Sequence, residues 1–493
     1  MAGQLRSIAE DLLGLVPSSV EYADVRVVRR RHEGVHVENE AVSQVMLVDT
    51  VGVGVRVLIG GQWGFAASSH LDSLDRAALV RRAVAQAKAA TGSGPPIRLA
   101  PVPVVRAVYC SPLARDPFAV PIDQKVSVLL SAADAMRRAG GAQVRTAEAS
   151  MDFFQDEKVF ASSEGALVEQ RLTESGAGLL ATAGDGEDTQ RRSYPQSVPR
   201  AIRGQRGDFA TRGYEHIEEM RLVEEAPRVA EEAVMLLTAA LCPVRTTTLI
   251  VGGTQMTMLV HETAGHPSEL DRVLGSEASL AGGSYMEPNQ RGALRFGSDL
   301  VNITADATLP GGLGSFGYDD EGVAAQRTPL IERGVFTGYL TSRESAGALD
   351  LTPTGAARAD GFARVPLVRM TNVSLEPHDE RGLSLDEMIA TTDDGILVDM
   401  NKSLSIDDRR LSFRFGCEMG WEIKRGRLGR VLKNCTYSGV TPQFWAACDA
   451  VGDRASFRLY GIPSCNKGEP LQVAHIGHGT VPARFRDVSV GVT

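Results

Sequence analysis

The segment TQMTMLVHETAGHP, residues 254–267, gathers the side chains best suited to chemistry. Within it stand His261, Glu262 and His266. Neutral imidazoles are common ligands of Zn²⁺, and a neighbouring carboxylate can take a proton from water at the metal. Two histidines beside a glutamate are therefore the groups that a zinc hydrolase uses. The competing interpretation is a pair of surface histidines near the end of a helix.

The spacing of the two histidines requires a local distortion of the helix. In the familiar zinc-protease motif they stand four residues apart, about 40° from each other at 100° per residue. His261 and His266 stand five apart, about 140°, and a regular helix cannot direct both at one ion. Pro267 disfavours the α conformation at His266. We therefore expect His266 at a distorted or terminated helix end, or else a π-type bulge, in which five residues make nearly one turn.

A catalytic zinc needs a third protein ligand, and three residues near the C-terminus are candidates. Cys465 lies in GIPSCNKGEP, which predicts a turn, and Lys467 nearby favours a thiolate. His475 and His478 stand three apart in AHIGHG, a predicted glycine-rich loop, where they could line the site or bind metal. Spacing alone leaves the choice among the three open.

Other polar residues receive supporting or structural roles. Glu269 and Asp271 could orient a ligand histidine, or could be solvated acids on a loop. Residues 319–321, DDE, lack the staggered ligands of a calcium loop, which favours a structural turn or a wall of the site. Histidines without a partner at a meaningful spacing are assigned to surfaces or strand faces: His32, His36, His70, His216 and His378. The remaining cysteines are predicted to be small buried hydrophobic residues: Cys110, Cys242, Cys417, Cys435 and Cys448.

The elements that must hold these residues change in character near residue 243. Alternation of polar and apolar residues and the Gly60–Gly61 turn predict antiparallel strands from about 22 to 65, followed by helices. Beyond the boundary, short strands and glycine-rich turns predominate. We therefore predict an α+β fold: an N-terminal domain of residues 1–243 with an antiparallel sheet and helices, and a C-terminal domain of residues 244–493, mostly antiparallel β, that carries the histidine helix.

The composition is that of a globular protein. The chain has 493 residues, of which 43% are hydrophobic and 23% charged, enough to bury a large core. It contains no run of about 18 apolar residues, so we expect no membrane span. Its net charge of −9 argues against nucleic-acid binding. Six scattered cysteines and an N-terminus without a secretory signal predict a cytoplasmic protein.

Several phrases of the chain together resemble the TldD/PmbA family of metallopeptidases, over nearly its whole length and in the right order: HETAGH, DDEG, LIERGVFTGYL, RMTN, the cysteine segment near the C-terminus and ENEAVSQVMLVDTVGVGVRVL. The retained motif places it on the TldD side. The resemblance implies a zinc ion bound by His261, His266 and Cys465, with Glu262 as the general base. It also implies a dimer, either a homodimer or a heterodimer with a metal-free TldE/PmbA-like homologue, that cleaves small or unfolded peptides.

Two departures from the family pattern affect the substrate cleft without removing a ligand. Pro267 follows the second histidine, where many members have a small residue, and Asn466 follows the cysteine, where glycine is common. Two alternatives to a peptidase therefore remain at this stage. One is a zinc-dependent hydrolase of an amide or C–N bond in a small biosynthetic intermediate, and the other is a non-catalytic subunit of a TldD/TldE-type complex.

Overall fold

The N-terminal half of the chain is built on one long, curved sheet. The structure is a computed structural model, and it describes residues 2–197, 207–277 and 282–491. The strand order is β3-β2-β1-β5-β6-β4, with β7 and β8 also paired to β6, and all pairs except β4–β6 are antiparallel. The strands are β1 (Tyr22–Glu38), β2 (Ala41–Ile59), β3 (Gln62–Ser68), β4 (Arg106–Cys110), β5 (Val144–Ser162), β6 (Leu167–Gly184), β7 (Thr189–Tyr194) and β8 (Asp208–Ala210).

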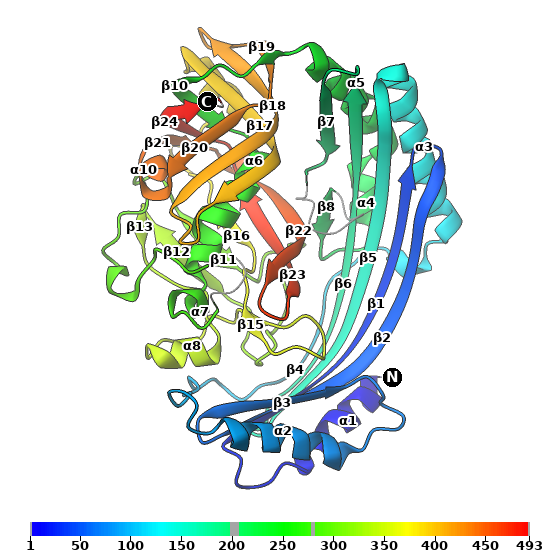
Figure 1. Cartoon of the computed structure of the whole chain (residues 1–493), viewed down its shortest axis with the longest axis vertical. Coiled ribbons are helices and arrows are strands. Elements are labelled where there is room, and N and C mark those ends of the chain that lie inside the picture. Colours follow the sequence, from blue (N-terminus) through cyan, green and yellow to red (C-terminus); the bar gives the residue numbers. More distant parts are fainter. Residues whose placement is uncertain (1, 198–206, 278–281, 492–493) are drawn as a thin grey trace.

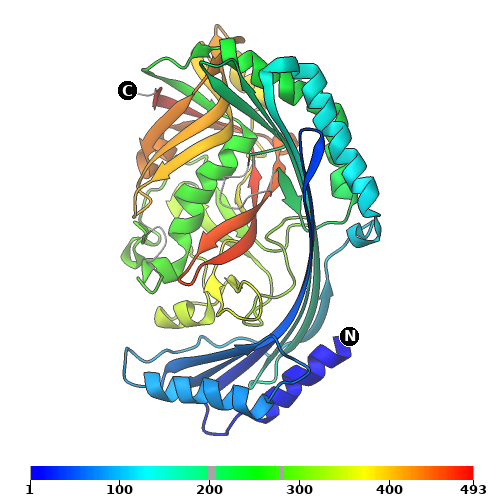
Figure 2. The ribbon, with the colours of Figure 1, turned by 45° about the vertical axis from the view of Figure 1, so that its right-hand side comes forward.

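Helices cover the outer face of this sheet, and the C-terminal half lies against its inner, concave face (Figures 1 and 2). They are α1 (Ala2–Gly14), α2 (Arg76–Ala90), α3 (Ile122–Gly140), α4 (Glu215–Met220) and α5 (Leu222–Thr238). Successive residues of a strand point to opposite faces. In β1, Val25 and Val35 therefore pack into the helix-covered cores, whereas Arg30 and His32 project toward the C-terminal half, where Arg30 pairs with Asp360.

The C-terminal half contains a second, mixed sheet in the order β17-β10-β24-β20-β18-β19-β9, with β21 on β24. Only its β10–β17 and β9–β19 pairs are parallel among the described pairs. Its strands are β9 (Ala240–Leu241), β10 (Arg245–Val251), β17 (Asp394–Ile406), β18 (Ser412–Lys424), β19 (Arg427–Lys433), β20 (Thr436–Val440), β21 (Cys448–Val451) and β24 (Ala483–Val490).

Smaller sheets and short helices complete this half. One sheet has the order β13-β12-β11-β16, and two further pairs are β14–β15 and β22–β23. These strands are β11 (Ile303–Asp306), β12 (Arg327–Glu332), β13 (Val335–Phe336), β14 (Ala357–Arg358), β15 (Leu367–Val368), β16 (Val373–Leu375), β22 (Arg458–Lys467) and β23 (Gln472–Thr480). The helices are α6 (Gly253–Val260), α7 (Leu270–Val273), α8 (Arg343–Ala348), α9 (Leu385–Ala390) and α10 (Thr441–Ala446).

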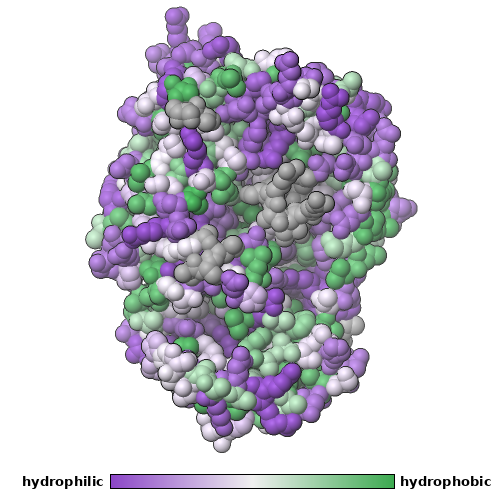
Figure 3. Space-filling model, in the orientation of Figure 1, coloured by the Kyte–Doolittle hydropathy of each residue, from purple (hydrophilic) through white to green (hydrophobic). Residues whose placement is uncertain are grey.

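The predicted α+β class and the β-rich C-terminal half that carries the histidine helix are confirmed. The halves are in contact across residue 243, since β9 pairs with β19 and Ser193 donates hydrogen bonds to the buried Glu418. The division into domains 1–243 and 244–493 stays a prediction. Hydrophilic and hydrophobic side chains are interspersed over the face in Figure 3. Within the described residues, every helix is too short or too polar to cross a bilayer.

Candidate metal centre

The two histidines of the motif are brought onto one side of their helix by a π-helical turn. Helix α6 continues directly into a π turn, His261–Gly265, and then into a 3₁₀ turn, His266–Ser268. The amide N–H of His266 donates to the carbonyl of His261, five residues back. A spacing of five residues therefore makes about one turn here, which confirms one of the two expected distortions.

The other expectation, that proline would push His266 out of the α region, is wrong. His266 has φ −59° and ψ −40°, in the α region. Pro267 opens the 3₁₀ turn that follows, a position where its missing N–H is not needed. A Cβ atom at Gly265 would lie 2.1 Å from the sulfur of Met370, so a larger residue here would require that this methionine move. The π hydrogen bond, rather than a broken helix, thus aligns the two rings.

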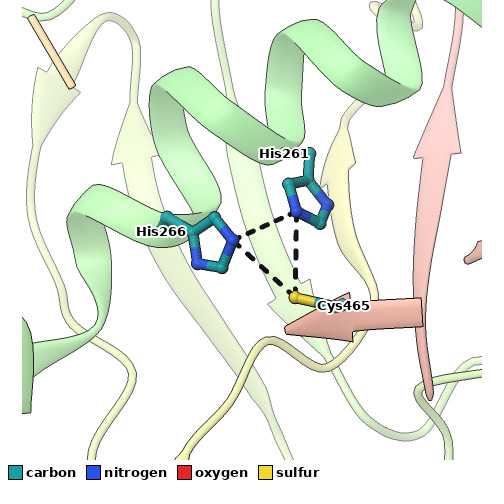
Figure 4. A group of neighbouring side chains, drawn as sticks. All are labelled: His261, His266 and Cys465. Carbon is teal, nitrogen blue, oxygen red and sulfur yellow. Dashed lines mark hydrogen bonds between the residues drawn. The ribbon is translucent and has the colours of Figure 1, made fainter. Parts of the chain in front are cut away.

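Three donor atoms converge at this turn (Figure 4). The Nε2 atoms of His261 and His266 are 3.1 Å apart, and Cys465 Sγ lies 3.8 Å from the first and 3.7 Å from the second. All three residues are buried, and their ligand atoms form a group within 4.8 Å of one another. Cys465 lies on strand β22, so its predicted place in a turn is wrong. Strand β22 places the sulfur of Cys465 next to the turn that carries His261 and His266.

Hydrogen bonds on the outer side of each ring fix which nitrogen carries the proton. His478 Nδ1 donates to the carbonyl of Val373 at 2.7 Å, so its Nε2 must accept, and His261 Nδ1 donates to it at 3.0 Å. His266 Nδ1 donates to the Glu269 carboxylate at 2.9 Å. A neutral imidazole has one N–H. With His266 in the neutral form that metal binding requires, the two Nε2 atoms that face each other both present lone pairs.

Two lone pairs and a sulfur in contact, without a proton between them, are the arrangement that a cation satisfies. Tetrahedral zinc with ordinary bond lengths would place its nitrogen ligands about 3.3 Å apart and nitrogen and sulfur about 3.6 Å apart, close to the observed separations. Burial raises the pKa of the Cys465 thiol, and the nearby Arg369 guanidinium lowers it. Burial lowers the pKa of His261 to about 4, so this ring is neutral. The donor set fits zinc.

The acids after the motif support the centre from inside the protein. Glu269, which orients His266, is fully buried and accepts a hydrogen bond from Arg272 at 2.8 Å. Lys467 Nζ lies 3.3 Å from Glu269 and donates to Asp271 at 2.7 Å. The interpretation as solvated acids is therefore wrong for both. Glu269 orients a candidate ligand directly, and Asp271 fixes Lys467.

The carboxylate of Glu262 is held by an arginine from a distant part of the chain. Arg410 Nη1 donates to Glu262 Oε2 from the turn between β17 and β18, and both side chains are buried. Burial raises the pKa of Glu262, but the Arg410 guanidinium outweighs it and the net pKa is lowered. Glu262 is therefore an ionised acceptor beside the two histidines.

Three family models match consecutive parts of the chain. The PmbA/TldA metallopeptidase C-terminal domain matches residues 245–491, domain 1 of the same family matches 23–89, and the central domain matches 115–241. The chain belongs to the PmbA/TldD family of metallopeptidases. The resemblance inferred from the sequence is thus confirmed.

Two of three relatives named here match nearly the whole length of this family member. It is 30% identical to a metalloprotease of Methanothermobacter thermautotrophicus over 97% of both chains. It is 25% identical to a metalloprotease TldD homolog of Haemophilus influenzae, which covers 96% of this chain and 94% of that one. A zinc metalloprotease TldD homolog of Saccharolobus solfataricus is 27% identical over 45% of this chain and 46% of that protein.

Solved structures share the fold. TldE from Thermococcus kodakarensis superimposes with a TM-score of 0.73 at 17% identity, over 100% of both chains. A putative modulator of a DNA gyrase from Thermotoga maritima gives a TM-score of 0.74 at 16% identity and covers 95% of this chain and 96% of that one. At this identity the likeness concerns the fold alone.

Several sequence-based assignments change in this PmbA/TldD member. His475 and His478 lie on strand β23 rather than in a loop; only His478 reaches the centre, whereas His475 bonds Glu174 of β6 at 2.6 Å. Residues 319–321 form the expected structural turn, in which the Asp319 carboxylate accepts backbone hydrogen bonds. Burial of the remaining cysteines is correct for three of them and wrong for two: Cys417, Cys435 and Cys448 are buried, Cys242 is half-buried and Cys110 is exposed.

Two supporting residues had no role assigned from the sequence. Arg410 stands 148 positions from Glu262, and nothing in the spacing of the chain links the two. Arg369, in the RMTN phrase, is buried and donates to the carbonyl of Cys465. Arg369 stands 96 positions from Cys465 in the sequence, so no local spacing links the two.

Proposed function

We propose that this chain is a zinc-dependent metallopeptidase that hydrolyses amide bonds of small or unfolded peptides. In this proposal His261, His266 and Cys465 hold the metal, and Glu262 is the general base. The observation that carries it is the meeting of two Nε2 lone pairs and one sulfur at 3.1 to 3.8 Å. Membership of a metallopeptidase family supports the kind of reaction.

Each residue of the site has a defined task in that reaction. A zinc ion supplies a Lewis acid, which polarises a carbonyl group and acidifies water. Glu262 accepts a proton from the attacking water, whose oxygen bonds to the scissile carbon, and passes the proton to the leaving amine as the C–N bond breaks. Arg410 fixes the carboxylate of Glu262. Glu269 and His478 keep the rings of the two histidines in the orientation that exposes Nε2.

We propose further that the chain acts in the cytoplasm and as a dimer, with itself or with a metal-free TldE/PmbA-like homologue. The fold shared with TldE supports this partner type. Mass measurement of the native assembly, purified from its own cells, tests the point. A mass of one chain alone contradicts the dimer, and a second chain of the same fold without the metal motif identifies the heterodimer.

Glu262→Gln tests the catalytic proposal. The amide keeps the size of the side chain but cannot accept the proton, so we expect zinc content to stay at the wild-type value and peptide hydrolysis to fall by about 10²- to 10⁴-fold. The measurement is the cleavage of a mixture of unfolded peptides, followed by mass spectrometry, with the chain in its native assembly. Glu224→Gln, a change on an exposed helix surface, is the matched control and retains hydrolysis. Full activity of Glu262→Gln would contradict the mechanism.

A further inference from the structure

A cavity lies between the inner face of the N-terminal sheet and the C-terminal half. It has about 660 Å³ of empty space, part of it open to solvent. Strands β5 and β6 supply one wall, and β14, β23 and the turn at residues 319–321 supply the other. Part of the lining is apolar and includes Phe154, Leu313 and Phe316. The rest is charged.

The charged groups of the N-terminal wall are already paired, either with one another or with groups of the other wall. Arg30 makes two hydrogen bonds to Asp156, at 2.7 and 2.8 Å. Lys158 lies 3.7 Å from Asp156 and 3.6 Å from Asp320. His475 reaches across from the other wall and bonds Glu174 at 2.6 Å. These groups therefore leave no surplus charge for a ligand.

Arg358 on β14 differs from these groups in its hydrogen-bond partners. Its guanidinium donates to two backbone carbonyls, of His475 at 2.7 Å and of Met370, and stacks over Phe316, with 5.6 Å from its carbon to the ring centroid. An arginine has five N–H donors, and within the described part of the chain none of those of Arg358 meets a carboxylate. Its Nε is a buried donor without a partner. The guanidinium is therefore held by carbonyl oxygens and a ring, without a carboxylate bonded to it in the described residues.

Burial and the nearby Arg369 together lower the pKa of Arg358 to about 10, against the carboxylates of Asp320 and Glu174, which raise it. Arg369 donates only to backbone carbonyls as well, those of Cys465 and Gln472. Two neighbouring guanidinium groups thus lie in the protein without a carboxylate bonded to either of them in the described residues. An anion from outside would satisfy both the charge and the remaining donors.

The cavity adjoins the candidate metal centre through the β22–β23 pair. Cys465 is paired directly with Ala474, which lines the cavity, and Cα atoms of paired residues lie about 4.5 to 5.5 Å apart. His475, whose carbonyl binds Arg358, is the next residue of that strand. Because an extended peptide advances about 3.3 to 3.6 Å per residue, an anion held at Arg358 belongs to a substrate group within a few residues of the donors.

We propose that this cavity is a carboxylate-binding subsite in which Arg358 anchors a carboxylate of the peptide substrate, with the apolar wall beside it receiving an apolar side chain. The inference rests on the proposed function. A terminal carboxylate held there makes the enzyme cut a few residues from the C-terminus of a peptide. A side-chain carboxylate held there makes it prefer an acidic residue at the same distance from the cut bond.

Binding without turnover tests the subsite. The probe is a dye-labelled hexapeptide of alanine and serine that ends in leucine, made as the free acid and as the C-terminal amide. Affinity is measured by fluorescence anisotropy with the full chain in its native assembly, carrying Glu262→Gln. We expect the acid to bind about tenfold to a hundredfold more tightly than the amide. Equal affinity of the two peptides, or no binding of either, overturns the proposal.

A second change assigns the effect to Arg358. In Arg358→Gln the acid should lose its advantage and bind as weakly as the amide, and Arg358→Lys should restore part of it. Arg454→Gln, which removes an exposed arginine paired with Asp379, is the control and keeps the wild-type difference. Unchanged discrimination in Arg358→Gln would overturn the assignment. A variant that fails to fold is recognised by its thermal unfolding, and the comparison of acid and amide in the Glu262→Gln chain still decides the proposal.

A third peptide identifies the source of the carboxylate. It carries glutamate in place of the final leucine and a C-terminal amide. Binding as tight as that of the free acid assigns the subsite to acidic side chains, and binding as weak as that of the leucine amide assigns it to the terminal carboxylate. These measurements are independent of hydrolysis. If a Glu262→Gln chain retained full cleavage, the proposed mechanism would fail while the difference in binding would stand.

Discussion

Two groups of histidines in this molecule have similar compositions and differ in where their ring protons lie. On the inner face of the N-terminal sheet, Asp152 accepts from His32 at 2.8 Å and from His36 at 3.2 Å. Both rings donate to this carboxylate, so the hydrogen bonding of the group is satisfied. At the π turn, the nitrogens of His261 and His266 meet lone pair to lone pair. A metal centre is therefore identified by lone pairs that converge without a shared proton, and not by the number of histidines nearby.

Removal of one converging ring should have the largest effect. We expect His266→Ala to reduce bound zinc from about one ion per chain to near zero, because a catalytic zinc keeps three protein ligands. His32→Ala, in the sheet group, should retain the ion. The measurement is metal analysis by inductively coupled plasma mass spectrometry after purification without chelators. Equal zinc content in the two variants would contradict the assignment of the metal to the histidines of the π turn.

The carboxylate behind His266 should have the next largest effect. Glu269→Gln keeps the shape of the side chain but weakens the acceptor for His266 Nδ1–H, and loss of such a partner lowers metal affinity by about 10- to 100-fold. Competition with a chelator of known affinity measures the change. Glu287→Gln, an exposed glutamate paired with Arg409, serves as the control. An unaltered zinc affinity in Glu269→Gln would show that the ring is oriented by other contacts.

The smallest effect on metal is expected in the sheet group, where Asp152→Asn should leave zinc content unchanged and act on stability. Burial raises the pKa of Asp152, but the hydrogen bonds from His32 and His36 outweigh it, and the net pKa lies below the usual 3.8. The ionised carboxylate therefore stabilises the folded state above about pH 4, and this contribution is lost as the pH falls through the folded pKa.

Urea unfolding as a function of pH checks this expectation. At pH 7 the Asp152→Asn chain should be less stable by about 1 to 3 kcal/mol, and the difference between the two proteins should narrow below pH 4. A loss of zinc in this variant would mean that the two groups are coupled. A difference in unfolding free energy that stays constant with pH would show that ionisation of Asp152 does not stabilise the fold.

The regular elements of the fold were predictable from the sequence, because alternation such as that of Val25 and Arg30 in β1 reports which face of a sheet is buried. The HETAGH motif likewise led to the π turn as one of two solutions. The histidine that bonds His261 Nδ1, which is His478, was harder to predict. His475 and His478 stand three apart on a strand, so they point to opposite faces, and their interpretation as a loop concealed this.

The remaining parts of the site come from residues far apart in the chain. Arg410 and Glu262, or Lys467 and Asp271, meet only after the sheets have formed, and no local spacing encodes such contacts. Arg358 and the cavity are of the same kind, since their walls come from both halves. Local patterns therefore indicated which residues could do chemistry, and the tertiary fold decides which of them do it together.

X-ray absorption at the zinc edge of the purified assembly tests the central claim most directly. We predict one zinc ion per chain with two nitrogen neighbours at about 2.0 to 2.1 Å and one sulfur neighbour at about 2.3 Å. The sulfur should disappear from the spectrum of Cys465→Ser. A wild-type spectrum without sulfur, or a protein that binds no zinc, would contradict the account.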